Sequence, residues 1–197
     1  MSITCITSLH HDALTDEASA RAPLERRFDL PDEAATHAFG ARFAHALDAL
    51  LCAASQESSP FAGLQVHLTG DLGAGKTTLV RATLRALGHT ARVRSPTWTL
   101  VEPYHVVTAR GELHLYHFDL YRFSDPAEWL DAGFRDYFGS GAVCLVEWPQ
   151  RAGQLLGTPD IEFALQTGNG NGRSENPGRI LTARAYSNQG KACLKKC

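Results

Sequence analysis

The segment Gly70–Thr77 constrains the fold of this chain more than any other feature. Its sequence, Gly-Asp-Leu-Gly-Ala-Gly-Lys-Thr, fits the pattern Gly-x-x-x-x-Gly-Lys-Ser/Thr, in which glycines let backbone amides surround an anion at the N-terminus of a helix. Residues 64–69 before it are typical of a strand, and residues 77–87 after it are typical of a helix closed by Gly88. Strand, glycine loop and helix in this order predict an α/β protein with the P-loop NTPase fold, built as a single domain.

Lys76 is the residue of this loop with the most specific chemistry. The chain has 19 lysines and arginines together, and Lys76 is the only lysine before residue 191. A genome biased toward arginine codons would explain the scarcity of lysine, but one lysine inside a glycine-rich loop indicates chemistry that a guanidinium group cannot replace. We expect Lys76 to bridge the β and γ phosphates of ATP, and the hydroxyl of Thr77 to bind Mg²⁺. The alternative is a glycine turn with a solvated lysine.

A P-loop also needs a carboxylate that holds the metal or orients water, usually at the carboxyl end of a neighbouring strand. Residues 143–147 form an apolar run that ends in Glu147, and a second predicted strand at 113–118 is followed by Asp119. We expect Glu147 on the metal side and Asp119 nearer the attacking water. Either acid, taken alone, could also be a strand-end residue that faces water. Trp148 is expected to face the nucleotide or an interface, with core packing as the commoner alternative.

The remaining sequence suggests one domain with an extension at each end. Residues 1–27 are polar with weak periodicity and are predicted to form a flexible N-terminal extension. Residues 28–186 form the predicted P-loop ATPase domain, which includes an amphipathic helix from about Asp32 to Leu51 and late strands at 161–165 and 179–185. Residues 187–197 have little core-forming power and are predicted to be a disordered tail.

Charge and cysteine content exclude several classes of protein. The net charge of −2 gives no overall basic footprint, so contact with nucleic acid requires a local patch or a partner protein, and DNA binding is not expected. The five cysteines include no Cys-x-x-Cys pair, which argues against a zinc knuckle. The sequence begins without an apolar export signal, and no run is long enough to cross a membrane. The prediction is a reduced, cytoplasmic protein outside the membrane.

Four segments occur in an order that is more specific than any single motif. They are Gly70–Thr78, Ser95-Pro96-Thr97-Trp98, His117-Phe118-Asp119-Leu120-Tyr121-Arg122 and Val146-Glu147-Trp148-Pro149. Together they resemble the bacterial TsaE (YjeE) family, the ATPase of tRNA threonylcarbamoyladenosine biosynthesis, over about residues 28–186. Trp98 stands where that family usually has Phe or Tyr.

The resemblance implies a mixed, mostly parallel sheet flanked by helices, with ATP and Mg²⁺ as the cofactors. It also implies that the ATPase supports two partner proteins, TsaB and TsaD, which install the threonylcarbamoyl group on adenosine 37 of tRNA. In this arrangement the ATPase does not perform the transfer, and tRNA is contacted indirectly through the complex.

The resemblance also assigns roles to individual residues. Lys76 and the amides of residues 73–78 would bind phosphates, Thr77 and Glu147 would hold Mg²⁺, and Asp119 would be needed for hydrolysis. Thr36 matches a family position near the nucleotide base. The predicted catalytic set is Lys76, Asp119 and Glu147, and the predicted nucleotide-binding set is Thr36, Asp71, Gly73, Ala74, Gly75, Lys76, Thr77, Thr78 and Trp148.

The same glycine loop also occurs in proteins with functions other than ATP hydrolysis in tRNA modification. A small-molecule or nucleoside kinase would transfer the phosphate, but no Arg-x-x-x-Arg lid segment follows Glu147. An ATP-dependent switch or binding module would bind the nucleotide without significant turnover, and slow, partner-stimulated hydrolysis would resemble it. A GTPase is disfavoured because the chain has no Asn-Lys-x-Asp motif, and an ATP-binding-cassette subunit because it lacks a Leu-Ser-Gly-Gly-Gln-like signature.

Overall fold

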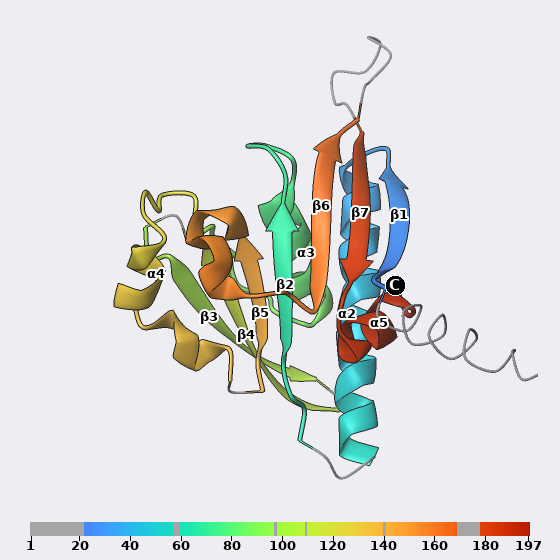
Figure 1. Ribbon diagram of the computed structural model, residues 1–197. Helices are drawn as coiled ribbons and strands as arrows, with labels where there is room; N and C mark the ends of the chain where they lie inside the picture. The colour runs from blue at the N-terminus through green and yellow to red at the C-terminus, as the bar shows by residue number, and fades with distance from the viewer. Residues whose placement is uncertain (1–21, 57–59, 97, 109, 140, 169–177) are drawn as a thin grey trace, which may run out of the picture.

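The strands of the chain form one mixed sheet, and its centre is parallel (Figure 1). The computed structural model describes residues 22–56, 60–96, 98–108, 110–139, 141–168 and 178–197. Within them the sheet has seven strands in the order β1-β7-β6-β2-β5-β4-β3. Their bounds are β1 Leu24–Leu30, β2 Leu64–Thr69, β3 Val101–Thr108, β4 Gly111–Asp119, β5 Val143–Glu147, β6 Ile161–Thr167 and β7 Arg179–Ala185.

Parallel pairing brings the carboxyl ends of the central strands to one edge of the sheet. β2 pairs in parallel with both β5 and β6, and β4 pairs in parallel with β5. The outer strands β3, β7 and β1 are antiparallel to their neighbours. The prediction of a mixed, mostly parallel sheet is confirmed for the central strands. Because β2, β4 and β5 run in the same direction, Thr69, Asp119 and Glu147 end their strands at the same edge.

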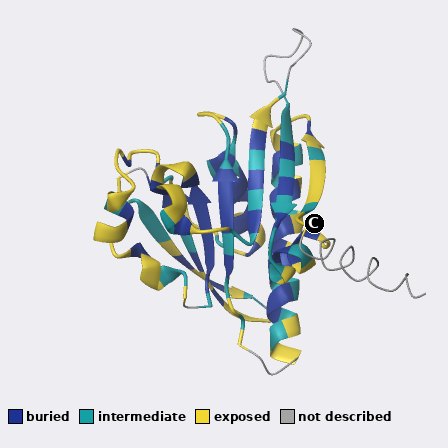
Figure 2. Cartoon of the chain, in the orientation of Figure 1, coloured by how far each residue is buried: buried dark blue, intermediate teal, exposed yellow. Residues whose placement is uncertain are grey.

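Helices cover both faces of this sheet. The long helix α2 (Glu33–Gln56) packs against α3 (Lys76–Ala86), and the two share a buried apolar core with the strands. A second apolar cluster lies on the opposite face of β4 and β5. It is covered by α4 (Ala127–Asp131) and by two 3-10 helices, Phe134–Tyr137 and Pro149–Leu156. Figure 2 shows the consequence for burial, since the central strands are buried and the outer surfaces of the helices are exposed.

Several predicted elements coincide with observed ones. The strand predicted at 64–69 is β2, the strand predicted at 179–185 is β7, and the helix predicted after the glycine loop is α3. The amphipathic helix is longer than expected and ends at Gln56. Within the described residues, no helix combines the length and the apolar character that crossing a bilayer requires.

The predicted disordered tail is wrong for the residues that follow Tyr186. Residues Asn188–Leu194 form helix α5, whose side chains Cys193 and Leu194 are fully buried in the main core. The hydroxyl of Ser187 caps this helix by accepting a hydrogen bond of 2.9 Å from the backbone N–H of Gly190. The tail is therefore part of the domain, because burial of these two side chains offsets the entropy of ordering a short segment.

The N-terminal boundary also differs from the prediction. Residues 24–27, which were expected to belong to the extension, are the first half of β1, and they pair with β7. β1 is an edge strand with mostly exposed side chains, so it carries little of the apolar alternation that marks a strand in a sequence. Residues 1–21 of the predicted extension and the glycine-rich stretch 169–177 lie outside the described residues.

Candidate nucleotide-binding site

The loop between β2 and α3 has a backbone that only glycine accommodates at several positions. Gly70, Gly73 and Gly75 have φ angles of +133°, +81° and +101°. A Cβ atom at Gly70 would also collide with the carbonyl oxygen of Leu165 on β6. The loop therefore follows a path that leads directly into the N-terminus of α3, where backbone N–H groups and the helix dipole favour an anion.

Lys76 is held across this loop by backbone carbonyls. Its Nζ donates hydrogen bonds to the carbonyl oxygens of Gly70, at 2.7 Å, and Asp71, at 2.9 Å. The same Nζ lies 3.9 Å from the centroid of the Trp148 ring, a cation–π contact. Burial lowers the pKa of Lys76, and the negative charges of Glu147, Asp119 and Asp71 partly oppose that shift. The ammonium group is thus held at the loop by two carbonyl oxygens and the ring of Trp148.

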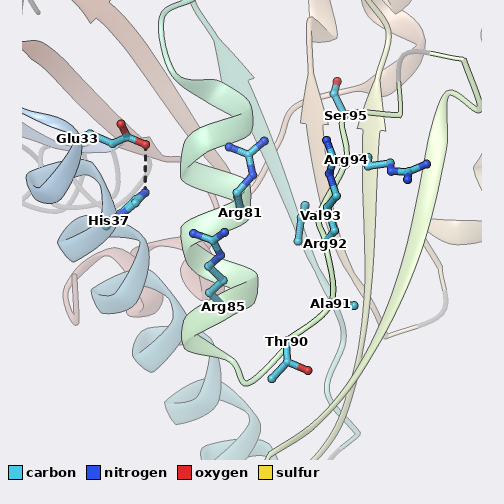
Figure 3. A pocket seen from close by; sticks show the side chains of 10 residues that line it. All are labelled: Glu33, His37, Arg81, Arg85, Thr90, Ala91, Arg92, Val93, Arg94 and Ser95. Carbon is cyan, nitrogen blue, oxygen red and sulfur yellow. Dashed lines mark ion pairs between the residues drawn. The ribbon is translucent and has the colours of Figure 1, made fainter.

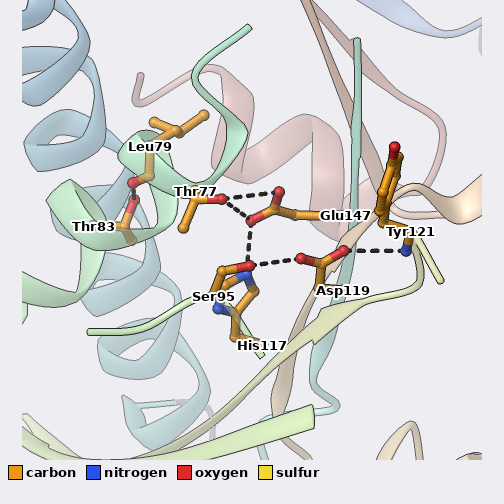
Figure 4. Close-up of polar contacts among 8 residues, drawn as sticks. All are labelled: Thr77, Leu79, Thr83, Ser95, His117, Asp119, Tyr121 and Glu147. Atoms are coloured by element: carbon orange, nitrogen blue, oxygen red, sulfur yellow. Dashed lines mark hydrogen bonds and ion pairs between the residues drawn. The ribbon is translucent and has the colours of Figure 1, made fainter. Parts of the chain in front are cut away.

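Thr77, Glu147 and His117 form a chain of polar contacts (Figure 4). The hydroxyl of Thr77 lies 2.8 Å from Oε1 and 3.1 Å from Oε2 of Glu147, to which it donates. Nε2 of His117 lies 2.8 Å from Oε1 of the same carboxylate. Glu147 and His117 are only 3% and 0% exposed. A threonine hydroxyl beside a carboxylate is an oxygen donor set that suits Mg²⁺, so these residues fit the metal that the loop pattern implies.

Asp119 lies next to this chain because β4 and β5 pair in parallel with Asp119 opposite Glu147. Its Oδ2 accepts a hydrogen bond of 2.6 Å from the hydroxyl of Ser95, and its Oδ1 accepts one of 3.1 Å from the backbone N–H of Tyr121. The carboxylate is therefore oriented from two sides, although it is not paired with a cation by any described contact. An oriented carboxylate of this kind can accept a proton from water or position it.

These side chains border one cavity of about 320 Å³. Its lining residues are Leu72, Gly73, Gly75, Lys76, Thr77, Thr78, Ser95, Asp119, Tyr121, Glu147 and Trp148. The cavity thus brings together both predicted acids, the lysine, the threonine and the tryptophan, although they come from separate parts of the sequence.

Three residues of the predicted nucleotide-binding set do not line the cavity. Ala74 is buried beneath the loop, and Asp71 contributes its carbonyl oxygen to Lys76. Thr36 is buried at the start of α2, where its Oγ1 lies 3.4 Å from Nη1 of Arg179. The side chain of Arg179 in turn occupies the space that a Cβ at Gly75 would enter. Thr36 is therefore connected to the loop through Arg179 rather than by direct contact.

His117 is the residue of the site that sequence reasoning missed. Taken with His114, it does not make a convincing metal pair, because side chains three residues apart on a strand point to opposite faces. The same alternation places His117 and Asp119 on one face of β4. Once Asp119 was assigned to the site, His117 could therefore have been predicted beside it. Arg122, which follows Asp119 in the motif, lies outside the cavity, with its guanidinium 4.1 Å from the centroid of the Trp98 ring. Thr97 lies outside the described residues.

Comparisons with known proteins consistently return one family. A family model described as "Threonylcarbamoyl adenosine biosynthesis protein TsaE" matches residues 30–175. The chain is 43% identical to the tRNA threonylcarbamoyladenosine biosynthesis protein TsaE of Haemophilus influenzae over 132 residues, which is 67% of this chain and 76% of the relative. It is 39% identical to the protein of that name from Bacillus subtilis over 62% of this chain and 70% of the relative. A crystal structure of Bacillus subtilis YdiB superimposes with a TM-score of 0.61 at 25% identity, covering 88% of this chain and 94% of that one.

Proposed function

Because the chain belongs to the TsaE family of threonylcarbamoyl adenosine biosynthesis proteins, we propose that it binds ATP with Mg²⁺ and hydrolyses it in support of tRNA modification. The observation that carries this proposal is the convergence of Lys76, Thr77, Asp119 and Glu147 on one cavity at the N-terminus of α3. A triphosphate needs an anion cradle, a cation and a metal-binding carboxylate, and the cavity offers all three.

The phosphate-binding part of the proposal rests on the loop and on Lys76. The amides of residues 73–78 would donate hydrogen bonds to phosphate oxygens, and Lys76 would move from the carbonyls of Gly70 and Asp71 toward the β and γ phosphates. Trp148 would help to keep the ammonium group of Lys76 at the cavity, because the face of its ring attracts the cation.

The hydrolytic part rests on the two carboxylates. Thr77 and Glu147 would hold Mg²⁺, whose charge neutralises the phosphates when it is bound. Asp119 would orient the attacking water and receive its proton, since Ser95 and the backbone of Tyr121 fix the direction of the carboxylate. His117 would keep the carboxylate of Glu147 in position through the contact of 2.8 Å to Oε1.

The partners in this proposal are TsaB and TsaD, which would carry out the transfer to tRNA in the cytoplasm. The chain offers a phosphate site and a hydrolytic carboxylate, so we assign it the nucleotide cycle that supports those partners. Hydrolysis would be slow in isolation and faster with the partners present, because binding energy from a partner can complete a partly formed site.

Nucleoside mass spectrometry of bulk tRNA tests the proposal in cells depleted of this protein. Expression of the wild-type chain is expected to restore threonylcarbamoyladenosine, whereas Asp119→Asn, which keeps the size of the side chain and removes its charge, is expected to fail. Arg135→Ala, an exposed substitution outside the cavity, is the matched control and should restore the modification. Normal modification in the depleted cells would contradict the role in tRNA modification, and full activity of Asp119→Asn would contradict the role given to that carboxylate.

A further inference from the structure

A second and larger hollow lies beside the nucleotide site, between α2, α3 and residues 90–95 (Figure 3). Its volume is about 710 Å³. We call it the arginine cleft, because Arg81 and Arg85 on α3 and Arg92 and Arg94 on the facing segment line it. Arg81 and Arg85 are one helical turn apart, so both side chains leave α3 on the same side. Four arginines therefore line one cleft in a chain whose net charge is −2.

No carboxylate of the described residues forms an ion pair with an arginine of the arginine cleft. None of the guanidinium groups of its four arginines forms a hydrogen bond or a salt bridge with any described residue. Glu33 is the only acid among the described lining residues, and its carboxylate lies 3.6 Å from Nε2 of His37. Like charges gathered without counterions repel one another, and an anion with several charges relieves that repulsion. An anion with several charges would therefore be attracted to the cleft.

The arginine cleft and the nucleotide cavity share one residue, Ser95. The hydroxyl of Ser95 donates to Asp119, so the segment that carries Arg92 and Arg94 ends at a contact with the hydrolytic carboxylate. An anion held in the cleft would lie outside the nucleotide cavity and next to it. The two sites therefore differ in every lining residue except Ser95 and are adjacent in space.

We propose that the arginine cleft binds the phosphate backbone of RNA directly, so that the protein contacts the tRNA itself. The inference rests on the proposed function for the identity of the RNA. Guanidinium groups form paired hydrogen bonds with phosphate oxygens, and several of them in one groove match a repeating phosphate chain. Among the described residues that line the cleft there is no Phe, Tyr or Trp, and only Val93 and Ala91 are apolar. A protein interface of this size would need buried apolar or aromatic anchors, so an acidic protein surface is the weaker candidate.

Fluorescence anisotropy with an unmodified tRNA transcript, measured without nucleotide, tests this inference. The test variant is Arg85→Ala/Arg92→Ala, which removes one exposed arginine from each side of the cleft. The control variant is Arg27→Ala/Arg135→Ala, which removes the same charge from exposed positions elsewhere. We expect the test variant to bind tRNA about tenfold more weakly or worse, and its dependence of log affinity on log salt to fall by about two, while the control stays near wild type.

Two further measurements separate this inference from the proposed function. Titration of a fluorescent ATP analogue should give wild-type affinity for the test variant, because neither arginine lines the nucleotide cavity. Binding of the TsaB–TsaD complex is measured on the same variants. Unchanged tRNA affinity and salt dependence in the test variant would overturn the inference, and loss of complex binding with tRNA binding intact would assign the cleft to an acidic protein surface instead. If the test variant loses tRNA binding and keeps ATP binding, the cleft is an RNA-binding site. This result would stand even if the protein did not hydrolyse ATP.

Discussion

Thr77 Oγ1 and Glu147 Oε1 lie 2.8 Å apart, although 70 residues separate them in the sequence. The parallel pairing of β2 with β5 places Glu147 opposite Leu68, one residue before the end of β2, and the glycine loop then turns back into α3. The hydroxyl at the second position of α3 therefore meets the carboxylate at the end of β5. The sheet register, rather than the local sequence, brings these two oxygen atoms together.

Glu147→Gln is expected to raise the Mg²⁺ concentration for half-maximal ATP hydrolysis about tenfold or more, because the amide keeps the shape of the side chain and loses the charge that a hard cation needs. Thr77→Val should act in the same direction, since it removes the hydroxyl, and Thr77→Ser, which keeps it, serves as the control. Hydrolysis measured over a range of Mg²⁺ concentrations checks this. An unchanged Mg²⁺ requirement in Glu147→Gln would exclude the carboxylate as a metal ligand.

His117→Phe is expected to raise the same Mg²⁺ requirement by about tenfold, because a residue that holds a metal ligand in position affects metal affinity nearly as strongly as the ligand does. His117 contacts Oε1 of Glu147, and its buried Nδ1 has no hydrogen-bond partner among the described residues. The control is His114→Phe, at an exposed position of the same strand. If both variants behave alike, the contact with Glu147 has no role in metal binding.

Leu194→Ala is expected to lower the free energy of unfolding by about 2–5 kcal/mol, the usual cost of truncating a fully buried leucine. Leu194 is 0% exposed and belongs to the main core, although it lies close to the end of the sequence. Lys195→Ala, at the exposed neighbouring position, should change stability by less than about 0.5 kcal/mol. Urea unfolding of both variants measures this. If Leu194→Ala is as stable as the wild type, residues 187–197 do not contribute to the core.

Stability is expected to fall as the pH is lowered below about 6.5, and His67 is a specific cause. Burial lowers the pKa of His67 from 6.5 to about 4. Between these values the unfolded chain binds a proton that the folded chain does not, so the contribution is complete above pH 6.5 and is lost progressively toward pH 4. Between pH 7.5 and pH 5 the loss amounts to about 2 kcal/mol. Urea unfolding at the two pH values should show this loss of stability, and the loss should be smaller in His67→Gln. An equal pH dependence of stability in His67→Gln and the wild type would exclude His67 as the cause.

The parts of the fold that the sequence predicted are those with a strong local pattern. The glycine loop lies between a short apolar strand and an amphipathic helix, and β2 and α3 follow that pattern closely. The parallel centre of the sheet was expected from the resemblance to a known family. β1 and α5 were missed, because an exposed edge strand and a seven-residue helix carry too little periodicity to stand out.

The candidate site divides in the same way. Four site residues could be identified from the sequence. Lys76 and Thr77 belong to the glycine-loop motif, and Asp119 and Glu147 stand at the ends of predicted strands. The contact of His117 with Glu147 depends on the register between β4 and β5, and the approach of Arg179 to Gly75 depends on the order of the strands. The arginine cleft has the same origin, since the net charge of the whole chain conceals a local cluster that only the packing of α3 against residues 90–95 produces.

The account depends above all on Lys76 as the cation of a phosphate site. Titration of a fluorescent ATP analogue against Lys76→Ala tests it most directly, with the exposed Lys195→Ala as a control that removes the same charge. We expect Lys76→Ala to weaken binding about 100-fold or more, or about 3 kcal/mol, because a charge-assisted contact to phosphate is lost, and Lys195→Ala to bind as the wild type does. Equal affinity in Lys76→Ala and the wild type would contradict the assignment of the loop to ATP.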